Sequence, residues 1–497
     1  MFDNAEIAHE VDKATYKKKE PQLRQALLDA QYQLLRESKF ATLILIGGVE
    51  GAGKGETVNL LHEWMDPRHL RTYSFTAPSD EEIERPYMWR FWRKLPPRGK
   101  VGIFFGAWHT QPIVGRATGH LSRGELDARI SEVKRFEKML TDEGVLLVKL
   151  WFHLTKKQQK KRLEALESDK RTRWRVGPQE WALFKRYDKF SKVSEHFVRA
   201  TSTGAAPWYV INGADPRYRA LTVGTTLLAA LRDRLDEKTP SKPGGNPPPL
   251  LPSVDGRNVL RALKLDRKVS EKEYEKKLEK LQGRLNLLSR DPRFKKLSVV
   301  AVFEGNDAAG KGGAVRRVFQ AIDARFIGSV PVAAPTEEER AQPYLWRFWR
   351  HLPRKGHFLI FDRSWYGRVL VERVEGFAEE SAWMRAYQEI NDFESDLVSS
   401  GIVLSKFWLA ISKEEQFRRF KEREKTPHKQ FKITEEDWRN RKKWDDYERA
   451  VCDMVDRTST HDAPWTLVEA NNKYFARLKV LATLADAVEQ GLDRVGK

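Results

Sequence analysis

The sequence predicts an α/β protein made of two tandem domains, each a parallel β-sheet covered by helices on both faces. The chain has 497 residues, and because single hydrophobic cores stop growing at about 250–300 residues, more than one domain is expected. Long stretches of the chain occur twice. Within each copy, short apolar runs alternate with longer helical patterns, which is typical of a parallel sheet with crossover helices.

The repeat has a constant offset. Residues 85–99 read RPYMWRFWRKLPPRG and residues 342–356 read QPYLWRFWRHLPRKG. The same offset of 257 residues relates Lys54 to Lys311. A repeat of this length without a gap predicts two homologous domains.

The boundary between the copies is predicted from composition. A stretch rich in proline and glycine separates them, and such residues favour an extended, semi-rigid connector. We therefore expect a first domain over 1–237, a linker over 238–255 and a second domain over 256–497.

The elements of the second copy follow from its apolar pattern. Residues 297–303, LSVVAVF, are continuous and β-branched, as in a strand that is buried on both faces. Residues 310–321 then predict a helix. Further strands are expected at 357–361, 403–409 and 465–469, and further helices at 344–352, 381–399 and 413–424.

The loop after the first strand of the second copy carries a phosphate-binding pattern. It matches G-x-x-x-x-G-K, and its residues are Gly305, Asn306, Asp307, Ala308, Ala309, Gly310, Lys311 and Gly312. Such a loop, here called the P-loop, turns backbone N–H groups toward a phosphate chain at a helix N-terminus, and its lysine adds a full charge. The first copy has a related loop at 48–55. The alternative is a glycine turn with a solvated lysine.

Two carboxylates are candidate magnesium ligands. The Ser or Thr that usually follows the P-loop lysine is Gly312 here, so a metal needs other ligands. Asp307 in the loop and Asp362 at the end of the strand 357–361 supply the oxygens that Mg²⁺ prefers. For each, a purely structural role as a loop cap stays open.

Arginines next to Asp362 distinguish the two copies. Arg363 and Arg368 follow it, where a guanidinium fork stabilises charge on a transferring phosphoryl group. The first copy has Phe105 and Gly106 at the places of Asp362 and Arg363. It keeps the loop lysine, but we expect it to be catalytically silent and the second copy to be the enzyme.

Two further basic segments are candidate phosphate contacts. The aromatic residues of 344–352 are expected to pack in the core, while Arg347 and Arg350 are either solvated charges or phosphate ligands. Residues 413–432 predict a charged helix and loop, the usual place for a lid over transferring phosphates. Arg419 and Arg423 share one face of it and are the lid candidates, with a solvated helix as the alternative.

Composition restricts the partners. Lys and Arg number 90 against 70 Asp and Glu, a net charge of +20, which favours a polyanion, an anionic membrane or a highly phosphorylated substrate. The single cysteine, Cys452, excludes an intramolecular disulfide and fits a reducing cytoplasm. The start lacks an export pattern and no apolar run reaches the roughly 18 residues of a membrane span, so we expect a cytoplasmic protein. Motifs for zinc hydrolysis or serine acyl transfer are absent from the sequence.

Three motifs together resemble one family. They are GNDAAGKG at 305–312, PTEEER at 335–340 leading to YLWRFWR at 344–350, and FDRSWYGR at 361–368. They resemble polyphosphate kinase family 2, and the fused two-domain layout resembles its polyphosphate:AMP phosphotransferase branch. The resemblance covers nearly the whole chain outside the linker.

The resemblance implies a three-layer α/β/α P-loop kinase fold with helical lids, dependence on Mg²⁺, and transfer of a terminal phosphoryl group between polyphosphate and a nucleotide. The family's catalytic roles fall on Asp307, Lys311, Asp362 and Arg363. It also implies that the first domain is the degenerate one. AMP is the favoured acceptor, giving ADP.

Three rival hypotheses stay open from the sequence. They are a polyphosphate-dependent kinase for ADP or GDP, an ATP-dependent nucleoside monophosphate kinase, and a polyanion-binding P-loop protein without turnover. The expected partners are polyphosphate and a nucleotide, not nucleic acid or a membrane. A homo-oligomer, with a dimer as the first choice, is expected because a silent domain can serve in subunit contacts.

Overall fold

The computed structural model describes residues 1–237 and 258–495, so the predicted linker at 238–255 lies outside the described residues. The described chain divides into two compact units. Within the described residues, unit 1 comprises 1–78, 90–237 and 335–346, and unit 2 comprises 79–89, 258–334 and 347–495. The domain boundaries expected from the sequence stay a prediction. No helix in the described parts of the chain has the length and apolar character needed to cross a membrane.

Unit 1 contains a five-stranded sheet in the order β2-β3-β1-β4-β5, with every neighbouring pair parallel. Its strands are β1 (Thr42–Gly48), β2 (Leu70–Ser74), β3 (Val101–Phe105), β4 (Leu146–His153) and β5 (Trp208–Asn212).

Unit 2 repeats this topology in the order β7-β8-β6-β9-β10, again with parallel pairs. Its strands are β6 (Ser298–Gly305), β7 (Ile327–Pro331), β8 (Phe358–Asp362), β9 (Ile402–Ala410) and β10 (Trp465–Glu469). The predicted fold class, two α/β domains with parallel sheets, is confirmed.

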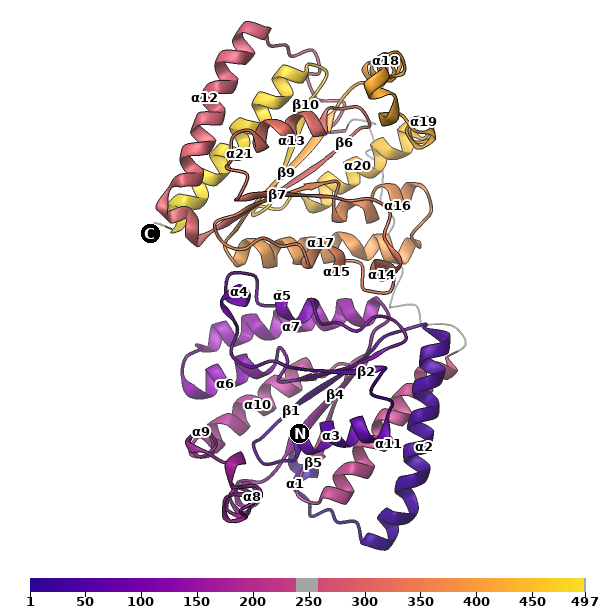
Figure 1. The fold of residues 1–497 in the computed structure, drawn as a ribbon, viewed down its shortest axis with the longest axis vertical. Coiled ribbons are helices and arrows are strands. Elements are labelled where there is room, and N and C mark those ends of the chain that lie inside the picture. The colour runs from indigo at the N-terminus through magenta and orange to yellow at the C-terminus, as the bar shows by residue number, and fades with distance from the viewer. Residues whose placement is uncertain (238–257, 496–497) are drawn as a thin grey trace. The chain divides into compact units, whose positions relative to one another are not determined.

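Helices cover both faces of each sheet (Figure 1). In unit 1, one face carries α2 (Lys13–Glu37), α3 (Lys54–Trp64) and α11 (Pro216–Asp236), and the other α6 (Thr110–Thr118), α7 (Arg123–Asp142) and α10 (Tyr187–Thr201). In unit 2, the corresponding helices are α12 (Glu271–Arg290), α13 (Lys311–Phe319) and α21 (Lys473–Val495), and α16 (Val371–Val374), α17 (Glu380–Ser399) and α20 (Trp444–Thr458).

The core of unit 2 explains why β6 is central. Val299, Ala301 and Phe303 of β6 are almost completely buried against α13 and α21. On the other face, Phe348 packs on Phe361 and Trp365, so the aromatic residues of the predicted 344–352 helix do belong to the core.

That segment forms a shorter helix than expected. The helix α15 spans only Trp346–Trp349. Pro353 follows it, and because proline lacks an N–H and disfavours helical backbone at the residue before it, extension on the C-terminal side is limited. The strand β7 was not expected at all, because its sequence IGSVP is short and contains both glycine and proline.

A lid segment, defined here as residues 413–442, follows β9. It comprises α18 (Lys413–Glu424), the 3₁₀ helix η4 (Pro427–Lys432) and α19 (Glu435–Lys442). The counterpart in unit 1 comprises α8 (Lys156–Ser168), η1 (Arg173–Arg175) and α9 (Pro178–Phe184). The remaining short helices are α1 (Asp3–Glu6), α4 (Asp80–Ile83), α5 (Trp89–Trp92), α14 (Glu337–Arg340), η2 (Pro292–Lys296) and η3 (Trp365–Arg368).

Candidate active site of unit 2

Register brings the predicted site residues to one edge of the sheet. Phe303 of β6 pairs with Asp362 of β8 on one side and with Phe407 of β9 on the other. Because parallel strands end at the same edge, the P-loop after β6 and the residues after β8 meet there. This edge is the switch point of the topology, since β6 lies between β8 and β9.

The P-loop needs small residues for its path. At Gly305, φ is +149° and a Cβ atom would lie 2.4 Å from the carbonyl oxygen of Leu409. Gly310 has a φ of +105° at the N-cap of α13. Ala308 adopts a φ of +64°, a left-handed conformation that costs energy for a residue with a Cβ and is concentrated at functional sites.

Arg419 holds the P-loop in place from the lid segment. Its guanidinium donates to the loop carbonyl oxygens of Ala308 and Ala309 at 2.9 and 3.1 Å. It also donates to the carbonyl oxygens of Ala470 and Asn471 after β10. Gln416 donates to the carbonyl oxygen of Asp307 at 3.2 Å, so α18 contacts the loop at several points.

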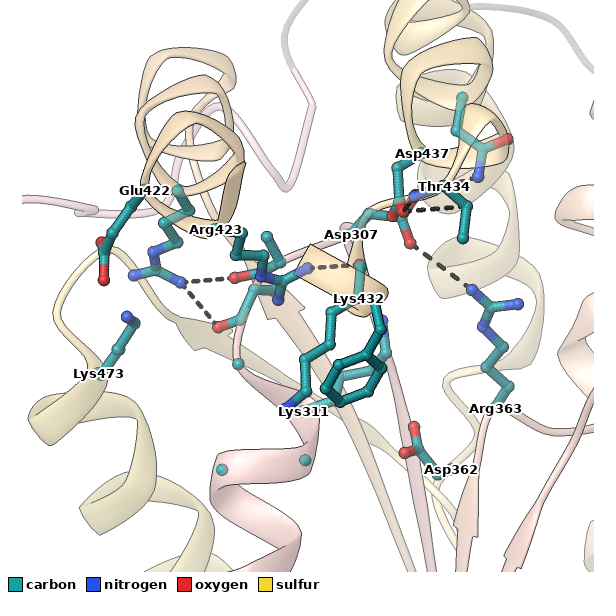
Figure 2. A pocket seen from close by; sticks show the side chains of 18 of the residues that line it. Asp307, Lys311, Asp362, Arg363, Glu422, Arg423, Lys432, Thr434, Asp437 and Lys473 are labelled. Atoms are coloured by element: carbon teal, nitrogen blue, oxygen red, sulfur yellow. Dashed lines mark hydrogen bonds and ion pairs between the residues drawn. The ribbon is translucent and has the colours of Figure 1, made fainter. Parts of the chain in front are cut away.

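Lysine, arginine and aspartate side chains converge above the loop (Figure 2). Lys311 Nζ donates to the carbonyl oxygen of Gly305 at 2.7 Å. The Arg363 guanidinium lies 3.7 Å from Asp307 Oδ1, while Asn440 Nδ2 of α19 donates to Asp307 Oδ2 at 3.0 Å. Asp307 is therefore held between the strand edge and the lid segment.

Arg363 has a left-handed backbone conformation and a guanidinium whose pKa is raised. Its φ is +63°, in the left-handed region. Burial lowers its pKa, but nearby carboxylates, Asp307 first, raise that pKa more, so the net direction is upward. The side chain remains 48% exposed and faces the cavity, which suits a cation that contacts a bound anion.

These residues line a cavity of about 620 Å³, whose lining includes eight basic and five acidic side chains. Predicted site residues on its wall are Asp307, Ala308, Ala309, Gly310, Lys311, Gly312, Asp362, Arg363, Arg419 and Arg423. Gly305 and Asn306 line a smaller adjoining cavity of about 90 Å³, which also has Asp307, Lys311 and Arg363 on its wall. The excess of positive charge favours a phosphate-rich ligand.

Three predicted arginines lie elsewhere. Arg347 donates to the carbonyl oxygen of Ala333 at 3.0 Å, and Arg368 forms an ion pair with Glu372 at 2.8 Å. Neither these two nor Arg350 lines either cavity. Their predicted contact with phosphate stays a prediction.

Several functional candidates were missed from the sequence. Glu304 at the end of β6 is buried, accepts a hydrogen bond from Ser364 at 2.9 Å and lines the smaller cavity. Burial raises the pKa of this carboxyl group. The signal was available, because its counterpart in the first copy is Gly47. The other missed lining residues with a charged or amide side chain are Arg316, Glu422, Lys432, Glu436, Asp437, Asn440, Lys473 and Arg477.

The donor set around the cavity fits a partly hydrated metal rather than a protein cage. Within 1–237 and 258–495, no group of three or more His, Cys, Asp and Glu side chains could hold a metal ion. Mg²⁺ usually binds through one or two carboxylates together with substrate phosphates and water. Asp307 and Asp362, both on the wall of the larger cavity, meet that requirement.

The corresponding edge of unit 1 lacks this chemistry. Phe105 ends β3 and Gly106 follows, so neither a carboxylate nor a guanidinium is present at the places of Asp362 and Arg363. Lys54 Nζ is bound to the Glu50 carboxylate at 3.1 Å and to two loop carbonyl oxygens.

A parallel α/β sheet, a P-loop at its switch point and a basic cavity that includes Asp307 and Asp362 are features of phosphotransferases of the P-loop kinase type. The family model for polyphosphate kinase 2 (PPK2) matches residues 10–239 and 268–494. The chain therefore belongs to the polyphosphate kinase 2 family, and the resemblance noted in the sequence is confirmed.

Similar proteins match either nearly the whole chain or about half of it. The polyphosphate:AMP phosphotransferase of Pseudomonas aeruginosa is 58% identical over 489 residues, covering 98% of this chain and 99% of that protein. A crystal structure assigned to polyphosphate kinase 2 of Pseudomonas aeruginosa PA01 matches with a TM-score of 0.90 and 55% identity, over 99% of this chain and 100% of that one. The GDP-polyphosphate phosphotransferase of Mycobacterium tuberculosis is 38% identical over 45% of this chain and 76% of its own length.

Proposed function

We propose that this protein transfers the terminal phosphoryl group of inorganic polyphosphate to AMP, which gives ADP and a chain shorter by one phosphate. The observation that carries the proposal is the 58% sequence identity, over nearly the whole chain, to a protein named for this reaction. The basic cavity of unit 2 supports it, because a polyphosphate chain carries about one negative charge per unit and needs many cations along its path.

In this proposal the P-loop and Lys311 bind the donor phosphates. Backbone N–H groups at a helix N-terminus favour an anion, and a phosphate would replace the carbonyl oxygen of Gly305 as the partner of Lys311 Nζ. Arg363 and Arg423 stabilise the charge on the transferring group from opposite sides of the loop. Phosphoryl transfer requires mainly positioning and charge neutralisation, so these groups suffice without a covalent step on the protein.

Mg²⁺ is part of the proposal. Asp307 and Asp362 would hold it, and when bound it neutralises phosphate charge next to the reacting group. Asn440 and Arg363 keep Asp307 in place, since both contact its carboxylate. We assign Arg419 to positioning the loop, because its N–H groups already bind protein oxygens.

The test is an acceptor assay without ATP. Polyphosphate is mixed with AMP, ADP, GMP or GDP, and the products are separated by chromatography. We expect AMP to be converted to ADP in a reaction that stops on chelation of divalent metal and returns with Mg²⁺. Phosphorylation of ADP or GDP alone would replace this function with the sibling activity.

That sibling, a polyphosphate-dependent nucleoside diphosphate kinase, is the second candidate. It is favoured by the similarity of part of this chain to the Mycobacterium tuberculosis protein named for GDP. An ATP-dependent monophosphate kinase and a binding protein without turnover both predict no ADP in this assay.

The proposal includes location and assembly. A cytoplasmic location is proposed because AMP is abundant there and one cysteine in 497 residues fits a reducing compartment. A homodimer is proposed, with unit 1 serving in subunit contacts. Light scattering on the purified chain distinguishes a monomer from a dimer.

A further inference from the structure

The two P-loops differ in what lies over the start of their helices. In unit 2, a Cβ atom added to Gly310 would meet no other atom within 4 Å, so the space over this residue is open, while Arg477 lies beside Gly313 one turn further on. In unit 1, a Cβ atom on Gly53 would lie 2.1 Å from Cζ of Arg219. The guanidinium of Arg219 therefore lies directly on the loop, where unit 2 has space for a phosphate.

Glu56 holds Arg219 in this position. Glu56 is in the first turn of α3, and its Oε2 pairs with Arg219 Nη2 at 2.5 Å. Its other oxygen pairs with Arg162 of α8 at 2.7 Å, and Arg175 lies 3.9 Å away. Arg219 Nη1 also donates to the carbonyl oxygen of Gly213 at 2.9 Å.

This arrangement has the features of a bound anion at a helix N-terminus. A negative group there is stabilised by the helix dipole, and arginines are its usual partners. The Arg219 side chain is 6% exposed, so its charge is buried and depends on the Glu56 carboxylate. Here the anion is part of the protein itself.

Unit 2 lacks both members of the pair. At the offset of 257 residues, Glu56 corresponds to Gly313 and Arg219 to Ala476. The counterpart of Arg162 is Arg419, which binds loop carbonyl oxygens instead. Unit 2 therefore has no carboxylate in this place, although the guanidinium of Arg477 lies 3.2 Å from where a Cβ atom of Gly313 would be, so an anion here has to come from outside.

We propose that Glu56 takes the place of a substrate phosphate in unit 1, so that this unit does not bind polyphosphate although it keeps the loop. Lys54 adds to this effect, since its ammonium is already paired with Glu50. A phosphate entering the loop would face the Glu56 carboxylate as a like charge and would have to displace its arginine contacts. Removing the carboxylate releases three arginines and turns the loop into an anion site.

The test is calorimetric titration of the full chain with tripolyphosphate. We expect Glu56→Gln to bind one more tripolyphosphate per chain than the parent, with an affinity that falls as salt rises. Arg162→Ala in the Glu56→Gln background should remove the added site. Lys54→Ala alone should leave the parent's stoichiometry unchanged.

Two outcomes would overturn the proposal. One is a parent chain that loses a tripolyphosphate site on Lys54→Ala, which would mean that unit 1 already binds phosphate. The other is a folded Glu56→Gln protein with no added site. Glu56→Gly, which copies the residue of unit 2, serves as a second variant, and calorimetric melting shows whether each is folded.

Comparing the stoichiometry of the parent with that of Lys54→Ala needs no change at Glu56. It therefore decides whether unit 1 of the parent binds phosphate, even if both Glu56 variants unfold. The AMP assay on the same samples is a separate readout. If the parent did not convert AMP to ADP but the tripolyphosphate stoichiometries were as expected, the proposed function would fail while the inference about Glu56 would stand.

Discussion

Arg419 offers a test of whether a lid arginine contacts substrate or builds the loop. All five N–H groups of a guanidinium can donate, and five protein oxygens are in place to accept them. They are Oε1 of Glu415 at 2.6 Å and the carbonyl oxygens of Ala308 at 2.9 Å, Ala309 at 3.1 Å, Ala470 at 2.8 Å and Asn471 at 2.9 Å. The side chain is 3% exposed.

The perturbation is Arg419→Lys, which keeps the charge but offers only three N–H groups, so at least two oxygens lose their donor. At about 1.5–3 kcal/mol for a hydrogen bond to a charged group, the expected loss in the free energy of unfolding of unit 2 is about 3–6 kcal/mol. For a domain of this size that lowers its melting temperature by roughly 6–24 °C. Turnover should fall with it, because Ala308 and Ala309 are part of the P-loop.

The matched control is Arg423→Ala, one helical turn further along α18. Among the described residues, Arg423 donates to a single protein oxygen, the carbonyl of Lys432, at 3.3 Å. We expect its free energy of unfolding to change by less than about 0.5 kcal/mol, while kcat/KM for polyphosphate falls by roughly tenfold, as for the loss of one charge contact.

Scanning calorimetry and steady-state kinetics on both variants decide the matter. A stable Arg419→Lys protein whose defect is confined to kcat/KM would refute the positioning role and restore the phosphate contact expected from the sequence. If Arg423→Ala destabilised unit 2 as much as Arg419→Lys does, the number of protein hydrogen bonds would not distinguish an arginine that positions the loop from one that contacts phosphate.

Three further predictions follow from the described contacts. Asp362→Asn and Lys311→Ala, made singly, should each lower turnover by at least roughly 100-fold with the melting temperature kept, because both charges act mainly in the transition state; turnover near the parent's would remove that residue from the mechanism. Lys406→Met should destabilise unit 2 by about 3–5 kcal/mol in calorimetry, since it leaves the buried Glu394 carboxylate, 2.6 Å from Lys406 Nζ, without its charge partner; an unchanged melting curve would contradict this. Burial raises the pKa of Cys452 to about 11, so iodoacetamide at pH 8 should modify it roughly 100-fold more slowly than an exposed thiol, and a rate equal to that of free cysteine would refute the assignment.

Much of the fold could be predicted because it depends on periodic apolar patterns. The strand expected at 465–469 coincides with β10, and the one at 403–409 differs from β9 by one residue at each end. Both strands are rich in apolar and β-branched residues and lie between clear breaks, so their limits are encoded locally. The strand β7 has no such run, and its place depends on pairing with β8, which only the folded chain provides.

The site was predictable where a residue type alone determines the chemistry. The P-loop has a fixed spacing, and Asp362 follows a recognisable strand. Asn440 could not be found this way, because its role depends on α19 folding back to bring its amide within 3.0 Å of Asp307. Arg419 was expected to contact phosphate because its charge is visible in the sequence, while the carbonyl oxygens that occupy it are not.

The internal repeat separates structural residues from chemical ones in both units. Arg347 donates to the carbonyl oxygen of Ala333, and in unit 1 its counterpart Arg90 donates to that of Thr76, at the same offset. A contact that recurs in a unit without Asp362 does not depend on the reaction, which argues that Arg347 supports the fold.

A buried ion pair also recurs in both units. Lys406 and Glu394 recur in unit 1 as the buried pair Lys149 and Glu137, each with a tryptophan N–H on the carboxylate, so this pair belongs to the fold. The opposite pattern, a residue that is absent from unit 1, identifies chemistry. Glu304 lies at the end of β6, and its counterpart in unit 1 is Gly47. Burying a carboxyl group costs free energy, and unit 1 keeps the same fold without an acid at this position. A buried acid that is absent from unit 1, next to Lys311 and Arg363 on the wall of one cavity, is therefore expected to serve the reaction. Glu304→Gln keeps the size and the hydrogen bond from Ser364, so it should lower kcat with little change in melting temperature. A fall in melting temperature at unchanged kcat would instead assign Glu304 to the fold.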